Sequence, residues 1–319
     1  MRLGFPVKVI GQAGLKEHDS RRWQNSPHLS VSLAYLRDIF EYLRRQRIGM
    51  YRMSSELAPY LTHPELTQFH GQIEECAAEL AAVGQLAQEF DLRLSFHPSQ
   101  YVVLNAPDEA LAAKGALDVA ALAELLDRMG LGDEAVVVVH VGGVYDAHEQ
   151  ARARFVAMFE RLPEQARCRL ALENDDTRFG VADTLWIHAR TGVRLVFDNL
   201  HHHNLNPEGV PLRDALAACL ATWPAHVRPK VHFSSPRTEM RVAEQQDPAT
   251  GRRVQLLQAP IWTRHSDYVH PFEFIAFLRE TAGLRPFDVM LEAKGKDLAL
   301  LRLREDVQRY APDLAGGIA

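Results

Sequence analysis

Cysteine is scarce in this sequence, and long apolar runs are missing. Three cysteines occur among 319 residues, Cys76, Cys168 and Cys219, and none belongs to a CxxC pair. Neither a disulfide framework nor a thiolate zinc site is therefore predicted, and we expect three buried, reduced thiols. No stretch approaches the roughly 18 uninterrupted apolar residues of a membrane span, and the first residues, MRLGFPVKVIGQ, lack the features of a signal peptide. We therefore expect a cytoplasmic protein with no membrane segment.

Strong charge of either sign is also missing. The formal net charge is -5, with 47% hydrophobic and 24% charged residues, which is typical of a globular protein. This balance does not indicate a nucleic-acid-binding surface, and by itself it favours an enzyme that acts on small molecules. Bound divalent cations would, however, reverse the field around a carboxylate-rich site, and a charge counted from the sequence omits them.

No linker rich in proline, glycine or serine divides the chain, so we expect one domain over residues 1–319, with a loose tail in the last few residues. Apolar, β-branched runs alternate with amphipathic segments, which is typical of βα units around a parallel sheet. The expected strands begin near Arg2, Ile48, Leu92, Ala135, Cys168, Val193, Arg228 and Phe287. Eight such units predict an α/β fold, a single (β/α)8 TIM barrel, with a doubly wound open sheet as the alternative.

Two segments are too long for ordinary connections. They cover residues 8–28 and 236–264 and follow the first and seventh expected strands, so both would lie on the same rim of a barrel. We expect each to be irregular and either functional or mobile.

The ends of the expected strands carry imidazoles and carboxylates. These residues are His97, His140, Glu173, Asp198, His201, His232 and Glu292. In a barrel all of these strand ends converge on the face that carries active sites. Carboxylates gathered there would repel one another unless cations bind between them. Nitrogen and oxygen ligands without thiolates suit zinc, manganese or iron, and their number exceeds the needs of one tetrahedral ion, so at least two ions are predicted.

A triple histidine follows the sixth expected strand, in the run FDNLHHHN. In an extended strand, residues three apart point to opposite faces, so Asp198 and His201 share a site only if the chain turns after Asp198. The flanking Asn199 and Asn204 are compatible with such a turn. Spacing alone does not decide which of His201, His202 and His203 is a ligand.

Several ions held by imidazoles and shared carboxylates favour hydrolysis of a phosphoester, because such ions activate water and stabilise the attacking and leaving oxygens. The same ligands also suit a sugar isomerase or epimerase. The residue types leave both reactions open.

Eight motifs, in order along the chain, resemble those of the UV-damage endonuclease family. They are YRMSSELAPYLTHP, LSFHPSQY, VVHVGG, LALENDD, VFDNLHHHNLNP, PKVHFSS, HSDYVHP and DVMLEAKGKD. The resemblance extends from Arg2 to about Asp297. It implies an α/β barrel related to endonuclease IV and to xylose-isomerase-like barrels. It also implies a cluster of three divalent ions, usually manganese, with zinc or iron as alternatives.

The resemblance implies a role for each matching residue. His97, His140 and Glu173 resemble one metal site, and Glu173 bridges to a second that is completed by Asp198, His232 and Glu292. His201 and His265 resemble ligands of the third ion. Lys230 matches a lysine that carries a carboxylate-type modification in family members, and His63 matches a histidine near the cluster. Glu173, Lys230 and His63 are therefore the expected catalytic residues, and Gln100 and Tyr101 match the pair that probes the duplex at the lesion.

Some positions depart from the family pattern. Phe5 stands where many relatives have tyrosine, and Val9 replaces a polar residue in the first loop. The pairs Arg21-Arg22 and Arg252-Arg253 could contact phosphates.

The function implied is hydrolytic nicking of double-stranded DNA immediately 5′ to cyclobutane pyrimidine dimers and 6-4 photoproducts, with abasic sites as a further class, by a monomer. The products would carry 3′-hydroxyl and 5′-phosphate ends. The alternatives are a metal-dependent sugar isomerase or epimerase of the same barrel superfamily, and a damage-binding protein without catalysis.

Overall fold

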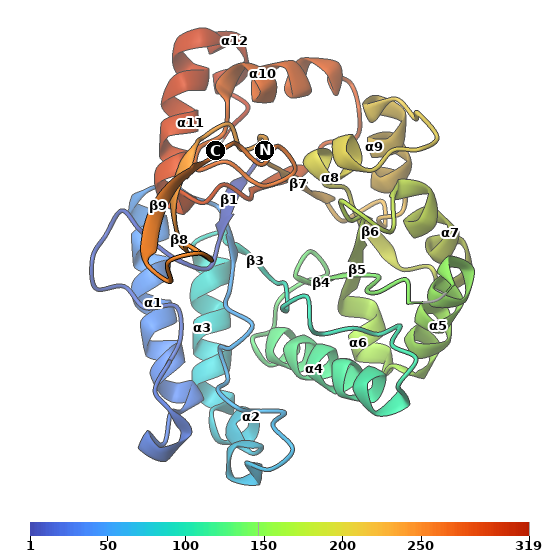
Figure 1. Cartoon of the computed structure of the whole chain (residues 1–319). Helices are drawn as coiled ribbons and strands as arrows, with labels where there is room; N and C mark the ends of the chain where they lie inside the picture. Colours follow the sequence, from blue (N-terminus) through green and yellow to red (C-terminus); the bar gives the residue numbers. More distant parts are fainter. Residues whose placement is uncertain (146, 319) are drawn as a thin grey trace.

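The structure is a computed structural model that describes residues 1–145 and 147–318. Its centre is a sheet of eight parallel strands that curls into a barrel (Figure 1). The barrel strands are β1 (Leu3–Pro6), β2 (Met50–Arg52), β3 (Arg93–Phe96), β4 (Val136–His140), β5 (Leu170–Glu173), β6 (Arg194–Val196), β7 (Lys230–Phe233) and β10 (Asp288–Leu291). Nearly every residue of these strands is buried, as expected for parallel strands that are covered by helices.

The strand order closes the barrel. Neighbours in the sheet run β6-β5-β4-β3-β2-β1-β10-β7. The two outermost strands, β6 and β7, meet through a bridge between Asp198 and His232, where the His232 amide donates to the Phe197 carbonyl at 2.8 Å. The prediction of a (β/α)8 barrel is thus confirmed, and the doubly wound open sheet is wrong.

Helices form a ring outside the strands (Figure 1). The longer ones are α1 (Leu29–Arg45), α3 (Ala77–Glu89), α4 (Glu109–Arg128), α5 (His148–Arg161), α7 (Val181–Thr191), α9 (Leu212–Ala221), α10 (Pro271–Glu280) and α11 (Lys296–Tyr310). The short ones are η1 (Trp23–Asn25), η2 (Thr67–Phe69), α2 (Gln72–Glu75), α6 (Glu164–Arg169), α8 (Asn199–Asn204) and α12 (Pro312–Ala315). In α1 the residues at helical spacing, Leu29, Leu33, Leu36, Phe40 and Leu43, are all buried, so one stripe of the helix faces the core.

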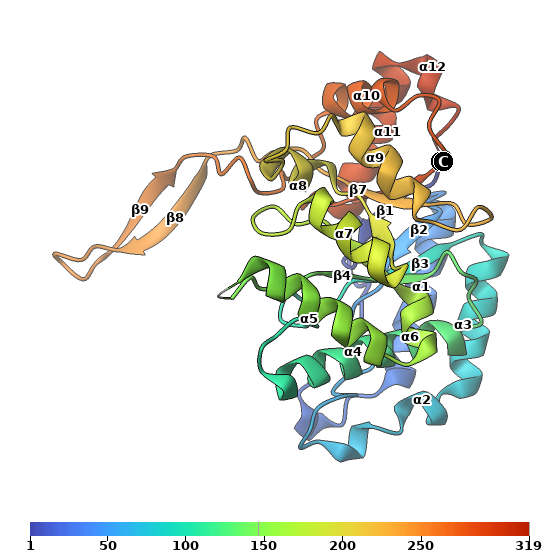
Figure 2. The ribbon, with the colours of Figure 1, turned by 90° about the vertical axis from the view of Figure 1, so that its right-hand side faces the viewer.

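The sequence predicts an irregular segment over residues 236–264, and this is wrong. The segment forms an antiparallel hairpin of β8 (Arg241–Gln246) and β9 (Arg253–Gln258). Figure 2 shows this hairpin projecting away from the barrel on the side where the barrel strands end. Its residues are exposed on both faces, which removes the alternation of buried and exposed positions that identifies a strand in a sequence. The segment 8–28 is irregular apart from η1, in agreement with expectation.

A buried ion-pair network lies at the opposite end of the barrel, where β3 and β10 begin. The guanidinium of Arg93 lies 3.1 Å from the Asp288 carboxylate, and both side chains are fully buried. Arg93 also donates to the carbonyls of Glu134, Arg228 and Pro229. Asp288 in turn accepts from the backbone amide of Arg2 at 2.8 Å.

The last described residues contact the rest of the chain. The N-terminal ammonium of Met1 donates to the Gly317 carbonyl at 2.8 Å, and Leu314 and Ile318 pack against the barrel core. Residue 319 lies outside the described residues.

Cys76 and Cys219 are free and buried, as expected, but Cys168 is free and exposed, so the expectation of a third buried thiol is wrong. Among the described residues no helix combines the length and the apolar character needed to cross a bilayer.

Candidate metal centre

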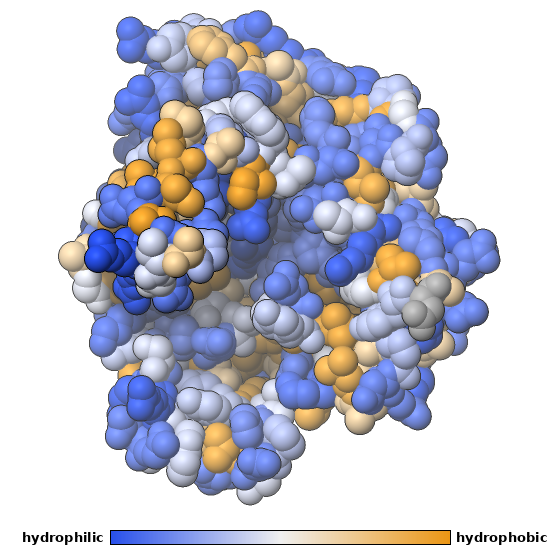
Figure 3. All heavy atoms as spheres, viewed as in Figure 1, coloured by the Kyte–Doolittle hydropathy of each residue, from blue (hydrophilic) through white to orange (hydrophobic). Residues whose placement is uncertain are grey.

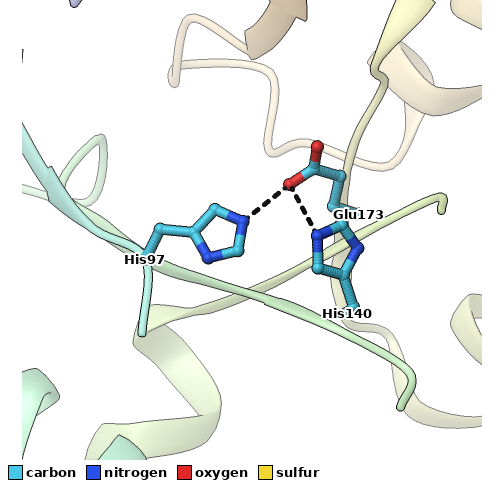
Figure 4. A group of neighbouring side chains, drawn as sticks. All are labelled: His97, His140 and Glu173. Atoms are coloured by element: carbon cyan, nitrogen blue, oxygen red, sulfur yellow. Dashed lines mark hydrogen bonds and ion pairs between the residues drawn. The ribbon is translucent and has the colours of Figure 1, made fainter. Parts of the chain in front are cut away.

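Three residues from the ends of adjacent strands form the first part of the site. The β4–β5 register places His140 beside Glu173, and His97 follows β3. The Glu173 Oε2 atom lies 3.0 Å from His97 Nε2 and 3.8 Å from His140 Nε2 (Figure 4). Since Glu173 is buried and both imidazoles point at one carboxylate oxygen, these three side chains could hold a metal ion.

The other oxygen of Glu173 belongs to a second group. Glu173 Oε1 lies 2.9 Å from His232 Nδ1, and Asp198 completes a group whose candidate ligand atoms all lie within 4.8 Å of one another. Glu292, which follows β10, lies 3.3 Å from His232 Nδ1. Glu173 is thus common to two candidate sites, as the family resemblance implies.

The turn after Asp198 explains the triple histidine. The Asp198 carboxylate accepts from the His201 amide at 2.8 Å and so caps the N-terminus of α8. One helical turn later, the His201 ring lies 3.4 Å from Glu173 Oε1. His202 instead packs against Phe197 and contacts the Val210 carbonyl at 3.0 Å. His203 is exposed and contacts the Asn199 carbonyl at 2.7 Å. Of the three, only His201 faces the cluster.

His265 follows the return strand of the hairpin, β9, by seven residues. A bridge between Pro236 and His265 fixes its backbone, and its Nδ1 lies 2.9 Å from the Glu292 carbonyl and 3.7 Å from Glu292 Oε2. Its ring centroid is 5.8 Å from that of His201. The two residues assigned to the third ion by resemblance are therefore neighbours.

The cluster has the donors that metal ions require. Within the described residues, Asp198 Oδ2, His232 Nε2 and His140 Nδ1 are buried and have no hydrogen-bond partner. Buried polar atoms are rarely left without a partner, because each costs free energy unless something binds it. The Asp198 oxygen is the donor of this kind that best fits a divalent ion, because His140 and His232 face Glu173 through their other ring nitrogens.

Electrostatics in the cluster favour a cation. Burial alone would raise the pKa of Glu173, but His232 and His140, with hydrogen bonds from His201 and His232, hold that pKa well below its usual value. Burial opposes ionisation of Glu292 as well, yet Arg52 and His232 keep its pKa well below the ordinary range. Burial lowers the pKa of His201, but Asp198 and Glu173 outweigh it and raise that pKa well above its usual value. The carboxylates are therefore ionised and attract positive charge.

Lys230 and Arg52 lie beside these ligands. The Lys230 ammonium is fully buried and donates to Ser95 Oγ at 3.0 Å. Burial, with the positive charges of Arg52 and Arg93, lowers the pKa of Lys230 well below its usual value. This shift makes loss of the ammonium proton easier, and the neutral amine is the form able to accept a carboxylate-type modification. Arg52, at the end of β2, pairs with Glu292.

Sequence reasoning missed two residues that position the ligands. Arg52 could have been noticed as an arginine inside an apolar strand, in MYRMS. Asn174, directly after Glu173, exchanges two hydrogen bonds with the Asp198 backbone, at 2.9 and 3.2 Å. Its own carbonyl lies 2.9 Å from His201 Nδ1. Its position in LALENDD was the available signal.

His63, Gln100 and Tyr101 lie away from the cluster contacts. The His63 Nδ1 accepts from the Glu65 amide at 3.3 Å, within its own loop. A cavity of about 420 Å³ among the loops after β1, β2 and β3 is lined by Arg21, His63, Ser99 and Lys114, among others. Tyr101, in the loop after β3, is 80% exposed, and Gln100 beside it is also exposed.

The first loop differs in part from expectation. Phe5 is fully buried against Tyr51, with ring centroids 5.5 Å apart, and Val9 is also buried, so neither side chain contributes to the outer surface. Arg21 pairs with the buried Asp19 at 2.6 Å.

The face that carries the cluster is concave. In Figure 3 the molecule is hollowed near its centre, and hydrophilic side chains surround the hollow. The hairpin projects from the barrel on this side (Figure 2). An open, polar hollow of this kind suits a large polar substrate better than an enclosed apolar pocket would.

Comparison with known proteins points to one family. A family model described as UV-endonuclease UvdE matches residues 16–313. A UV DNA damage endonuclease of Bacillus velezensis is 33% identical over 308 residues, which is 94% of this chain and 89% of the relative. A UV DNA damage endonuclease of Bacillus mycoides is 34% identical over 268 residues, covering 83% of this chain and 77% of the relative.

Solved structures share the fold. The crystal structure of SacUVDE aligns with a TM-score of 0.80 at 30% identity and covers 97% of this chain and 98% of that one. The apo form of 3-keto-D-glucoside 4-epimerase, YcjR, from E. coli aligns with a TM-score of 0.54 at 14% identity, over 97% and 98% of the two chains. The second similarity shows the barrel fold alone.

Proposed function

This chain belongs to the UV-endonuclease UvdE family, and from that premise we propose that it nicks double-stranded DNA immediately 5′ to UV photoproducts. The substrates proposed are cyclobutane pyrimidine dimers and 6-4 photoproducts, with abasic sites as a further class. The observation that carries the proposal is the pair of candidate metal groups joined through Glu173 at the ends of the barrel strands. The enzyme is a nuclease that acts on DNA.

The cluster residues would hold divalent ions, for which we propose three of manganese, with zinc or iron as alternatives. His97 and His140 would act with one oxygen of Glu173, and His232 and Asp198 with the other. Such ions, when bound, lower the pKa of water and stabilise negative charge on phosphate oxygens. His201, His265 and Glu292 extend the same ligand set toward the hairpin.

In the proposed reaction, water adds to the phosphorus on the 5′ side of the lesion and the bond from that phosphorus to O3′ breaks. The departing O3′ gains a proton, so the products carry 3′-hydroxyl and 5′-phosphate ends. The side chains position these atoms, and none of them forms a covalent bond to the DNA in this scheme. Glu173 orients the imidazoles on either side of it, and Arg52 holds Glu292 in place.

Lys230 and His63 have supporting roles in this proposal. Lys230 lies among the ligand-bearing strands with a depressed pKa, and a carboxylate-type modification would convert it from a cation that repels metal ions into an anion that attracts them. His63 lines the cavity beside the first and third loops and would contact the substrate or the cluster when the loops close on DNA.

Gln100 and Tyr101 would recognise the lesion by deformability. A damaged, poorly stacked dinucleotide costs less to extrude than an intact pair, and an exposed aromatic ring can fill the space left in the stack. Tyr101 is exposed enough to do so. Tyr101→Ala should therefore lower kcat/KM on a dimer-containing duplex about 10-fold, in the range expected for loss of base stacking. Tyr310→Ala, at another exposed tyrosine, is the matched control, and equal losses for the two variants would contradict the assignment.

The direct test uses a labelled duplex with one cyclobutane pyrimidine dimer, with manganese or with EDTA, and maps the cut to the nucleotide. Metal-dependent incision directly 5′ to the dimer is the expected result. Preferential binding of the lesion duplex without any incision would favour a damage-binding protein. Isomerisation of a ketose or aldose without DNA cleavage would favour the sugar isomerase alternative.

A further inference from the structure

The β8–β9 hairpin leaves the barrel directly from the candidate metal centre. Its base is fixed by the bridge between Pro236 and His265 and by a hydrogen bond from the Arg237 amide to the Arg264 carbonyl at 2.7 Å. Asn204, in α8, donates to the Thr263 carbonyl at 3.2 Å. The base of the hairpin and a candidate metal ligand are therefore one segment, and its direction is set by the same contacts that position His265.

Beyond this base, the hairpin stands free of the barrel (Figure 2). The six paired positions, from Arg241 opposite Gln258 to Gln246 opposite Arg253, form a regular ladder. Nearly all of these residues are exposed, including Val242 at 63% and Leu257 at 65%. Six residues at about 3.3 Å each give an arm roughly 20 Å long. A two-stranded ribbon of this length without a packed face is marginal alone, so a partner that covers it would stabilise it.

The hairpin segment is basic in an acidic chain. Residues 236–264 carry five arginines against two glutamates and one aspartate, a net charge of +2, whereas the whole chain carries -5. Asp247 is used inside the tip, where it accepts from the Ala249 amide and the Thr250 hydroxyl at 2.8 Å each. Arg252 and Arg253 follow this turn and are exposed.

The side chains along the ribbon suit a nucleic acid. Arginine is the commonest donor to phosphates and to guanine, and glutamine pairs with adenine edges. The ladder carries four glutamines, Gln245, Gln246, Gln255 and Gln258, besides the arginines of the tip. The exposed Val242 and Leu257 lie opposite each other near the base and offer apolar contact to sugars or thymine methyl groups.

We propose that the β8–β9 hairpin is a second DNA-binding element, a ribbon that enters the major groove of the duplex on one side of the lesion. This inference rests on the proposed function, because it assumes that the hollow receives damaged DNA. The major groove is wide enough to admit a two-stranded β-ribbon. An arm of roughly 20 Å spans about six base pairs along the duplex axis, at about 3.4 Å per pair. The cluster makes the cut, and the hairpin binds intact duplex beyond it.

The experiment compares the full chain with two variants on a dimer-containing duplex of about 30 base pairs. In the first variant Arg252 and Arg253 are changed to alanine, and in the second residues 241–258 are replaced by an Asn-Gly turn. In the second variant, hydroxyl-radical footprinting should show that the protected stretch of DNA is about four to six base pairs shorter, and only on one side of the lesion. The first variant should weaken binding about 10-fold and reduce the slope of log affinity against log salt by about two.

A duplex trimmed to the lesion and a few flanking pairs supplies the internal control. On that substrate both variants should cut as fast as the unchanged chain, because the hairpin has nothing to bind. Loss of cutting on both lengths would show damage to the metal centre next to His265 and would overturn the assignment of the hairpin as a separate element. No incision by the unchanged chain on either length would instead contradict the proposed function.

The matched control variant is Arg128→Ala combined with Arg161→Ala. These arginines are exposed at the C-terminal ends of α4 and α5, outside the hairpin, and they change the net charge by the same amount. An equal effect of the two double variants on the salt slope would overturn the proposal. So would an unchanged footprint in the hairpin variants together with loss of a concentration-dependent dimer in sedimentation, which would identify a second copy of the chain as the occupant.

Discussion

Two clusters of charged side chains, each with a fully buried aspartate, Asp198 or Asp288, occupy the two ends of one barrel, and they differ in what their polar atoms contact. At the base, Asp288 accepts from Arg93 and from the Arg2 amide, and Arg93 donates to three carbonyls. At the opposite end, Asp198 and His232 each leave a buried atom without a partner in the described residues. The difference separates a cluster that the protein satisfies by itself from one that requires something else to bind.

In the Arg93–Asp288 cluster, too, one polar atom lacks a hydrogen-bond partner. Arg93 Nη2 also lacks a hydrogen-bond partner among the described residues, but its guanidinium lies over the Trp223 ring, 5.5 Å from the centroid. A cation over an aromatic face is stabilised by that ring. An unpartnered carboxylate oxygen in a protein interior has no comparable substitute, which makes Asp198 the stronger indication of a missing cation.

The largest expected effect comes from changing Glu173, whose two carboxylate oxygens join the two candidate metal groups. Glu173→Gln keeps the shape but removes the charge shared by both groups, so incision of the dimer duplex should fall by at least about 10³-fold, equivalent to about 4 kcal/mol. Binding of the lesion duplex, measured by anisotropy, should change far less. Full incision by this variant would refute the assignment of Glu173.

An Asp→Asn substitution at each end of the barrel should change the free energy of unfolding by different amounts. Asp288→Asn leaves the Arg93 charge buried without its counter-ion and should lower the free energy of unfolding by about 3–5 kcal/mol. Asp198→Asn can still cap α8 and should cost less than about 1 kcal/mol in metal-free protein. Urea denaturation in EDTA measures both. Equal losses would mean that the two clusters serve stability alike.

Metal binding should stabilise the folded protein through the cluster around Glu173 and not through the Arg93–Asp288 cluster. Manganese at 100 times its dissociation constant should raise the free energy of unfolding by about 2.7 kcal/mol for each ion bound, because only the folded state has the site, and EDTA should reverse the gain. Asp288→Asn should retain the increment, although it starts from a lower stability, whereas Glu173→Gln should lose most of it. An increment that survives in Glu173→Gln would place the ion elsewhere.

The smallest effect concerns another buried carboxylate, Asp19, which pairs with Arg21 and the His28 amide in the first loop. Hydrogen bonds from Arg21 and from the His28 amide lower the pKa of Asp19 to about 2, against the opposing effect of burial. Its stabilising contribution is fully present above the unfolded pKa, near 3.8, and is lost as the pH falls through about 2. We expect about 1 kcal/mol, since Arg21 is half exposed and partly screened. The stability difference between the unchanged chain and Asp19→Asn should shrink from pH 6 to pH 3, and a constant difference would contradict this pKa.

The strand ends were the predictable part of both fold and site. Parallel strands bury both faces, so their apolar runs and the polar residues that end them, such as His140 and Glu173, stand out in the sequence. The role of His201 depends on α8, which begins only because Asp198 caps it, and spacing does not show a cap. The Arg93–Asp288 pair joins residues 195 positions apart, and no local pattern connects them. The hairpin stayed hidden because it buries neither face.

The bridge between Asp198 and His232 has a mechanical meaning. The other adjacent pairs of described barrel strands share ladders of two or more residue pairs, whereas β6 and β7 are joined by this single bridge. The barrel should therefore open first between β6 and β7. The two residues of this bridge, Asp198 and His232, are both candidate metal ligands. The His232 amide bonds to the Phe197 carbonyl between β6 and β7, so its rate of deuterium uptake would report how often the barrel opens there. Binding of metal ions to Asp198 and His232 would then slow that exchange.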